Sequence, residues 1–157
     1  MLPPELQDLL DRYAHGPSLL RRALDGVDAG TVGRVPPGSD WSIRDVVTHL
    51  VDAELVRAVR IRTIIAEDEP PIVPFDEGLW KRRLQYLWRN LEGSVALFDQ
   101  LCYSTAEILR HAGKDAWARA GKHPDRGILT VRDLVQAGID HVEEHTAQVR
   151  AAREAFQ

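Results

Sequence analysis

Apolar residues recur at three- and four-residue steps through almost the whole chain, a spacing that is typical of amphipathic helices. It predicts a helix from Leu6 to Leu24, a second from Ser42 to Ile64, a third segment from Leu79 to Leu109 and a last helix that begins at Thr130. Glycine and proline interrupt the stretches between them. Because no segment alternates apolar and polar residues, we expect no sheet. Each expected helix has one apolar face. Four such faces are buried most simply against one another in an all-α four-helix bundle with long connections.

Two of the expected helices begin with the same chemistry. Asp45 follows Ser42 by three residues, and Asp133 follows Thr130 by the same step, so each pair resembles a capping box. Two explanations of this similarity stay open. The two helix starts have independently acquired the same favourable residues, or the chain contains a pseudo-symmetric pair of helix hairpins. The third segment is long for one globular helix, and Gly93 marks the expected break.

Composition narrows the class of protein. A chain of 157 residues is close to the size of one ordinary domain, so we expect residues 1–157 to form a single domain. A net charge of −4 argues against nucleic-acid binding, which needs clustered basic residues. No apolar run is long enough to span a membrane. The single cysteine and the absence of signal-peptide features from the start of the chain favour a cytoplasmic protein.

Three of the six histidines point to a metal site. His141 and His145 lie one turn apart on the inward face of the last helix, and His49 lies on the inward face of the second helix. Three imidazoles leave one ligand position of a metal open for water or substrate, which is the arrangement of catalytic zinc. Cys102 is expected to pack as a small hydrophobe, which excludes a cysteine-based site. The alternative is a metal-free core in which these histidines bond to neighbours or water.

The other three histidines have simpler interpretations. His15 precedes Gly16 and Pro17, where we expect an early break in the first helix. His111 lies at a helix C-terminus, where a partly positive imidazole suits the helix dipole. His123 precedes a proline in the last long connection and is not expected to bind the metal.

Two stretches of the chain resemble the DinB/YfiT-like family of small metal-binding bundles. One runs from Trp41 to Leu50 and contains His49. The other runs from Trp117 to His145 and contains the Thr130 helix start and the histidine pair. The resemblance covers the chain from about Leu6 to Ala152. It implies a four-helix bundle with a divalent metal, most often zinc or nickel, on His49, His141 and His145.

The same resemblance implies a range of activities. Characterised relatives include thiol S-transferases and isomerases that use low-molecular-weight thiols, and other members are classed as hydrolases; many are homodimers. We therefore expect a metal-dependent enzyme, of thiol-transferase or hydrolase type, acting on a small-molecule substrate with a thiol as a candidate co-substrate. Two alternatives stay open: a non-enzymatic metal-binding or stress-associated bundle, and a metal-free helical module.

No dedicated general base stands out in the sequence. Asp52 and Glu144 are candidates only because each lies close to a histidine along its helix. Asp52 follows His49 by three residues, so its carboxylate is placed to accept the second imidazole N–H and hold the ring. The favoured interpretation of Asp52 is nevertheless an ordinary solvated helix charge.

Overall fold

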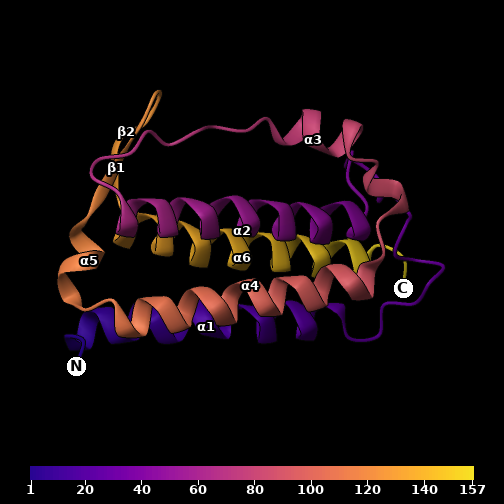
Figure 1. The fold of residues 1–157 in the computed structure, drawn as a ribbon. Coiled ribbons are helices and arrows are strands. Elements are labelled where there is room, and N and C mark those ends of the chain that lie inside the picture. The colour runs from indigo at the N-terminus through magenta and orange to yellow at the C-terminus, as the bar shows by residue number, and fades with distance from the viewer.

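Four long helices lie side by side in the structure, a computed structural model that describes residues 1–157 (Figure 1). They are α1 (Pro4–Leu24), α2 (Ile43–Ala66), α4 (Leu91–His111) and α6 (Val131–Glu154). The predicted all-α four-helix bundle is confirmed. No helix has both the length and the apolar content that crossing a membrane requires.

The helix directions differ from those of a simple up-and-down bundle. The helices α1 and α6 run one way and α2 and α4 run the other (Figure 1). Because α1 and α2 each pack against both α4 and α6, every helix has one parallel and one antiparallel neighbour. The parallel pair α2 and α4 requires the connecting segment 67–90 to return along the bundle before α4 begins. This crossover covers one side of α2.

Both predicted capping boxes are present. The Ser42 hydroxyl accepts the Asp45 backbone N–H at 3.1 Å, and the Asp45 carboxylate accepts the Ser42 backbone N–H at 3.0 Å. The equivalent distances between Thr130 and Asp133 are 3.0 and 2.8 Å. In each capping box, this reciprocal pair of hydrogen bonds satisfies backbone N–H groups that have no partner within the helix. They fix the starts of α2 and α6, the two helices that carry the histidines of interest.

A hydrophobic core of 29 buried residues runs along the bundle axis. Each long helix contributes a fully buried side chain, such as Leu10, Leu50, Phe98 and Val135. Burial of each such side chain contributes roughly 1.5–3 kcal/mol, so these stripes hold the helices together. Cys102 packs in this core as predicted, and burial raises the pKa of its thiol.

The third predicted helix is broken, but not at Gly93. The segment contains α3 (Glu77–Arg83), a 3₁₀ turn η1 (Tyr86–Trp88) and then α4. The chain leaves the helical path because Gln85 has a left-handed φ of 55°. Asn90 then begins α4 as its N-cap, and its side-chain oxygen accepts the Gly93 backbone N–H at 2.7 Å. Gly93 therefore belongs to the first turn of α4, and the predicted break there is wrong.

The prediction of no sheet is also wrong. After the short helix α5 (Lys114–Ala118), strands β1 (Ala120–His123) and β2 (Gly127–Thr130) pair as an antiparallel hairpin. Strands of four residues are too short for their alternation to be recognised in the sequence. The His123 imidazole Nδ1 accepts backbone N–H groups of Asp125 and Arg126 at 3.1 and 3.2 Å, so this histidine holds the hairpin turn.

The first helix continues through the expected break near His15. Pro17 lies inside α1, where it removes one backbone hydrogen bond. Tyr13 and Leu20 are buried on either side of it. Their packing outweighs the lost bond, which is why α1 stays intact.

Candidate metal centre

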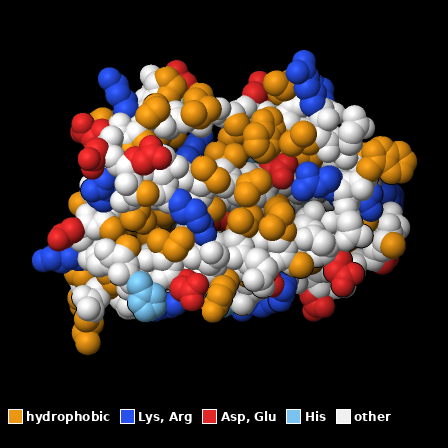
Figure 2. Space-filling model, viewed as in Figure 1, with side chains coloured by type: hydrophobic (Ala, Val, Ile, Leu, Met, Phe, Trp, Pro, Cys, Tyr) orange, Lys and Arg blue, Asp and Glu red, His pale blue; other side chains and the backbone are white.

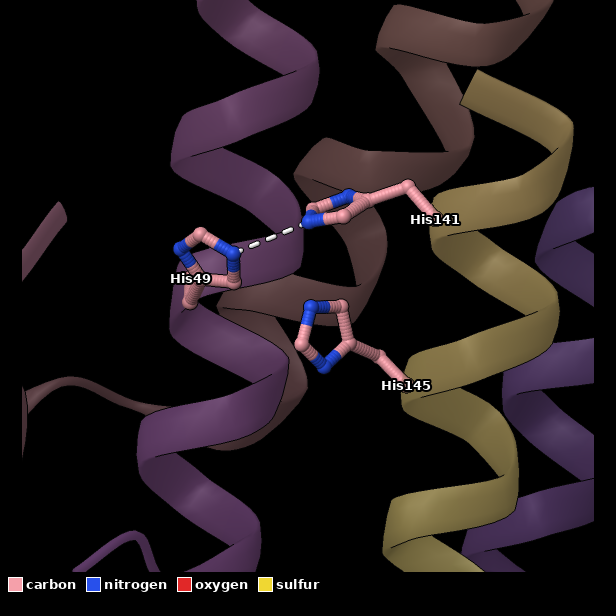
Figure 3. A group of neighbouring side chains, drawn as sticks. All are labelled: His49, His141 and His145. Atoms are coloured by element: carbon pink, nitrogen blue, oxygen red, sulfur yellow. Dashed lines mark hydrogen bonds between the residues drawn. The ribbon is translucent and has the colours of Figure 1, made fainter. Parts of the chain in front are cut away.

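Three histidines far apart in the sequence meet between α2 and α6. His49 extends from α2, and His141 and His145 extend from α6 toward it (Figure 3). One potential ligand nitrogen from each ring lies within 4.8 Å of the other two. His49 is buried, and the other two are half-buried. The structure thus brings together all three histidines that the sequence singled out as metal ligands.

Ring contacts show which nitrogens converge. His49 Nε2 and His141 Nε2 lie 2.9 Å apart (Figure 3), while the buried Nδ1 of each ring has no hydrogen-bond partner. His145 Nδ1 lies 2.8 Å from Gln148 Oε1. Because that amide oxygen only accepts, Nδ1 carries the proton and Nε2 keeps its lone pair. Gln148, which the sequence gave no reason to single out, therefore orients His145 as a ligand.

The donor set suits a divalent ion. Neutral imidazoles are common ligands of zinc and nickel, which they bind through one nitrogen at about 2.0–2.1 Å in the case of zinc. Two Nε2 atoms that face each other at 2.9 Å are close enough to share one ion. Without an ion, one Nε2 can donate an N–H to the other at this distance; when both rings are protonated at Nδ1, both Nε2 lone pairs are free to bind one ion.

Electrostatics hold two of the rings in their neutral form. Burial, together with smaller contributions from the charges of His145 and Arg57, lowers the pKa of His49 to about 4. Burial, and to a smaller extent the charges of Arg57, His145 and His49, lower the pKa of His141 to about 2. Both imidazoles are therefore deprotonated near neutral pH, which is the state that binds metals.

A buried polar cluster supplies the positive charge beside the histidines. Arg57 Nη1 donates to Glu54 Oε2 at 2.6 Å, and the Tyr13 hydroxyl donates to the other oxygen of Glu54. Gly138, one turn before His141, leaves space for this cluster: a Cβ there would lie 3.1 Å from Arg57 Cδ. No local spacing predicts the cluster, although Gly138 on the inward face of the last helix is a signal of a large neighbouring side chain.

Asp52 does not behave as a solvated charge. It is only 4% exposed, and its carboxylate accepts the Tyr86 hydroxyl at 2.8 Å and lies 3.5 Å from Arg89 Nη2. The favoured interpretation from sequence is therefore wrong, because Tyr86 of η1 and Arg89, which follows η1, cover that side of α2. These bonds tie the crossover to α2 and leave no hydrogen bond from Asp52 to His49. Glu144 is exposed on α6 and has no hydrogen bond to the imidazoles.

Two residues that sequence analysis missed border the cluster. Glu77 Oε2 lies 3.5 Å from His49 Nε2, and the Trp41 ring meets the His49 ring edge to face at 5.4 Å. Glu77 begins α3 and is largely exposed, so its carboxylate reaches the centre from the solvent side. Its role depends on how the crossover folds back over α2, which no local spacing reveals.

Comparison with known proteins identifies the family to which the chain belongs. The model of the DinB superfamily matches residues 12–149. The chain belongs to the DinB superfamily. It is 25% identical over 134 residues to "Putative metal-dependent hydrolase YfiT" of Bacillus subtilis, which covers 85% of this chain and 75% of that relative. A relative with the same description from Oceanobacillus iheyensis is 26% identical over 147 residues, covering 92% of this chain and 80% of the relative.

Solved structures show the same fold. The structure of YfiT from Bacillus subtilis, described as having an unusual four-helix bundle topology, matches with a TM-score of 0.90 at 22% identity over 99% of this chain and 90% of that one. A mycothiol-dependent maleylpyruvate isomerase matches with a TM-score of 0.75 at 16% identity, covering 93% of this chain and 60% of the isomerase. The crossover between α2 and α4 is therefore a feature of a known bundle topology.

We predict that this DinB-superfamily chain, in the absence of metal, loses stability in acid. The pKa values of His49 and His141 are lowered to about 4 and about 2, whereas unfolded histidine titrates near 6.5. Below pH 6.5 the unfolded chain takes up protons that the folded chain does not. Each of the two histidines therefore lowers the free energy of unfolding by roughly 1 kcal/mol per pH unit, until the pH reaches its folded pKa. Urea unfolding between pH 7 and 5 measures this loss.

A double variant provides the control for that measurement. His49→Gln with His141→Gln removes both titrating groups, so the stability of the metal-free variant should change much less between pH 7 and 5. An equally steep decline in the variant would assign the acid sensitivity to other residues.

Proposed function

We propose that this chain is a metal-dependent enzyme that holds a divalent ion, zinc or nickel, on His49, His141 and His145. The observation that carries this proposal is the convergence of three imidazoles, two of them held neutral by burial, on one point between α2 and α6. The descriptions of the relatives as metal-dependent hydrolases support it. The substrate we infer is a small molecule, since the cluster lies between two helices of the bundle with Glu77 of α3 beside it.

The residues around the cluster have separable tasks. A divalent ion held there would lower the pKa of a water or thiol at its open position and provide a nucleophile near neutral pH. Gln148 keeps Nε2 of His145 free to bind. The Trp41 ring covers one side of His49 and limits the access of bulk water. Glu77 Oε2 is the nearest carboxylate oxygen and is placed to accept a proton released at the centre.

Hydrolysis and thiol transfer are the two reaction types that such a centre supports. The structural similarity to a mycothiol-dependent isomerase favours a thiol as co-substrate. The thiol would have to be a separate small molecule, because the only cysteine of the chain, Cys102, is buried in the core with a raised pKa. Water as the nucleophile would give the hydrolase suggested by the names of the relatives.

Metal analysis followed by turnover assays tests the proposal. We expect the purified protein, after reconstitution with zinc or nickel, to retain about one ion per chain. It should then hydrolyse esters or amides, or conjugate a low-molecular-weight thiol to an electrophile, and lose that activity on addition of a chelator. A protein that retains no stoichiometric ion would refute the metal centre. A loaded protein without chelator-sensitive turnover in either screen would refute the enzyme and leave a metal-binding bundle.

A further inference from the structure

A cleft of about 630 Å³ separates α2 from the crossover segment that runs alongside it. Its walls are mainly apolar, and include Leu55, Val56, Val59, Val73, Phe75 and Trp80. Figure 2 shows hydrophobic side chains gathered on this face, over α2 and beside α3. Its volume lies within the range of about 300–1,000 Å³ that is typical of small-molecule sites.

The outer wall of the cleft is held in place at several points. The Ile72 backbone N–H donates to the Lys122 carbonyl at 2.9 Å, and the Lys122 N–H donates to the Pro70 carbonyl at 3.0 Å. Gly121 allows this contact, since a Cβ there would lie 2.8 Å from the Pro70 oxygen. Farther along, Arg60 Nη2 donates to the Val73 carbonyl at 2.5 Å. These anchors hold the cleft open in advance, which lowers the cost of binding.

The charged residues in the wall, Arg60 and Asp76, are each partly engaged by neighbouring backbone groups. Arg60 uses its guanidinium on the Val73 carbonyl, and the Asp76 carboxylate accepts the Leu79 backbone N–H at 2.7 Å as the N-cap of α3. Nη2 of Arg60 and one oxygen of Asp76 are thus occupied in building the wall, while the buried Nε of Arg60 has no partner. What the cleft offers to a ligand is apolar surface, of which Val59 and Val73 are the most exposed examples.

The cleft lies next to the histidine cluster along α2, although none of the three histidines lines it. Val56 follows His49 by seven residues, so the two lie on the same face of α2 about 10 Å apart along its axis. The helix α3 joins the two regions: Glu77 lies 3.5 Å from His49 Nε2, while its neighbours Asp76 and Trp80 line the cleft. A molecule whose polar group lies at the histidines would therefore have room for an apolar portion about 10 Å long beside α2.

We propose that this cleft binds the aliphatic or aromatic portion of a small-molecule substrate whose reacting group lies at the three histidines. The inference rests on the proposed function for the identity of that reacting group. The cleft itself, however, does not depend on metal. Its preformed walls and its position beside the cluster favour a small ligand over a protein segment, which would need a longer open groove.

Binding of 1-octanol tests the cleft without any reaction. In metal-free and zinc-loaded protein, NMR shifts of backbone amides should concentrate in residues 55–64 and 70–80. Leu55→Glu should weaken binding at least tenfold, because it places a charge on the apolar wall. Leu97→Glu on α4 is the matched control, since both leucines are 41% exposed in helices, and should leave binding unchanged. Absent or scattered shifts would overturn the proposal.

Hydroxamates of two lengths test the continuity of the cleft with the metal centre. The hydroxamate group chelates zinc, so octanohydroxamate should bind zinc-loaded protein at least 100-fold more tightly than acetohydroxamate, given about fourfold per buried methylene. Leu55→Glu should abolish most of that difference. Equal affinity of the two compounds would overturn the assignment of the cleft to the substrate tail.

The two tests separate the cleft from the proposed function. If octanol binds the cleft but the protein retains no zinc, the proposed function fails and the apolar binding site stands. If zinc binds but octanol does not, the cleft proposal fails alone. A third outcome would also overturn the cleft proposal: the protein does not bind octanol, and it forms a dimer that Leu55→Glu dissociates. A second copy of the chain would then occupy this face.

Discussion

Replacement of His141 by alanine is expected to abolish stoichiometric metal binding and to reduce metal-dependent turnover by at least about 100-fold. His141 supplies the Nε2 that lies 2.9 Å from Nε2 of His49, so the variant retains only two of the three imidazoles. Outer-shell substitutions around metals already cost about 10–100-fold, and loss of a ligand should cost at least as much. Zinc content per chain and a zinc titration by calorimetry measure the effect.

Two further variants make this result specific. His111→Ala removes an exposed histidine at the end of α4 and should leave the zinc content unchanged. His141→Cys replaces one zinc ligand by another and should restore part of the binding that His141→Ala loses. If His141→Ala bound one equivalent of zinc with unaltered affinity, the three-histidine ligand set would be wrong.

The second large effect is expected at the buried polar cluster. Glu54→Leu should lower the free energy of unfolding of the metal-free protein by about 3–5 kcal/mol. Glu54 is 1% exposed and accepts hydrogen bonds from both Arg57 and Tyr13. Without it, the guanidinium and the phenol hydroxyl remain in the bundle with no partner, and an uncompensated buried charge is costly. Urea unfolding at pH 7 measures the change.

An exposed ion pair provides the control for Glu54. Asp68 lies 2.9 Å from Arg119 but is almost fully exposed, so Asp68→Leu should leave the unfolding midpoint nearly unchanged. Adding Arg57→Met to Glu54→Leu removes the orphaned charge and should recover more than half of the lost stability. A mild effect of Glu54→Leu alone would show that water reaches the cluster after the substitution.

The histidine set was accessible from sequence because helical geometry is local. His141 and His145 are four residues apart, so any α-helix places them on one face, and the apolar residues around His49 indicate its inward direction. The structure brings the three rings together as those patterns indicated. What the patterns could not show was the orienting hydrogen bond that His145 Nδ1 donates to Gln148, since many i,i+3 neighbours make no contact.

The features that differ from the sequence-based predictions have a common physical cause. Asp52 follows a histidine on a helix, and its burial depends on Tyr86 and Arg89, which arrive from a different part of the chain. The break before α4 depends on a left-handed residue, Gln85, which carries no glycine signal. The hairpin from Ala120 to Thr130 is too short for its period to be read. Each feature is decided by neighbours that are remote in sequence or by too few residues to form a pattern.

By itself, the sequence determined α1, α2, α6 and most of α4, the capping boxes of α2 and α6, and the inward direction of three histidines. These properties depend on hydrogen bonds and side-chain spacing within one or two turns. Only the tertiary structure decided that α2 lies antiparallel to α6, so that His49 meets the pair on α6, and that the crossover returns over α2. That return brings Glu77 to the cluster and forms the apolar cleft beside it. Helix direction and the path of a long connection depend on packing summed over the whole bundle, which no local pattern encodes.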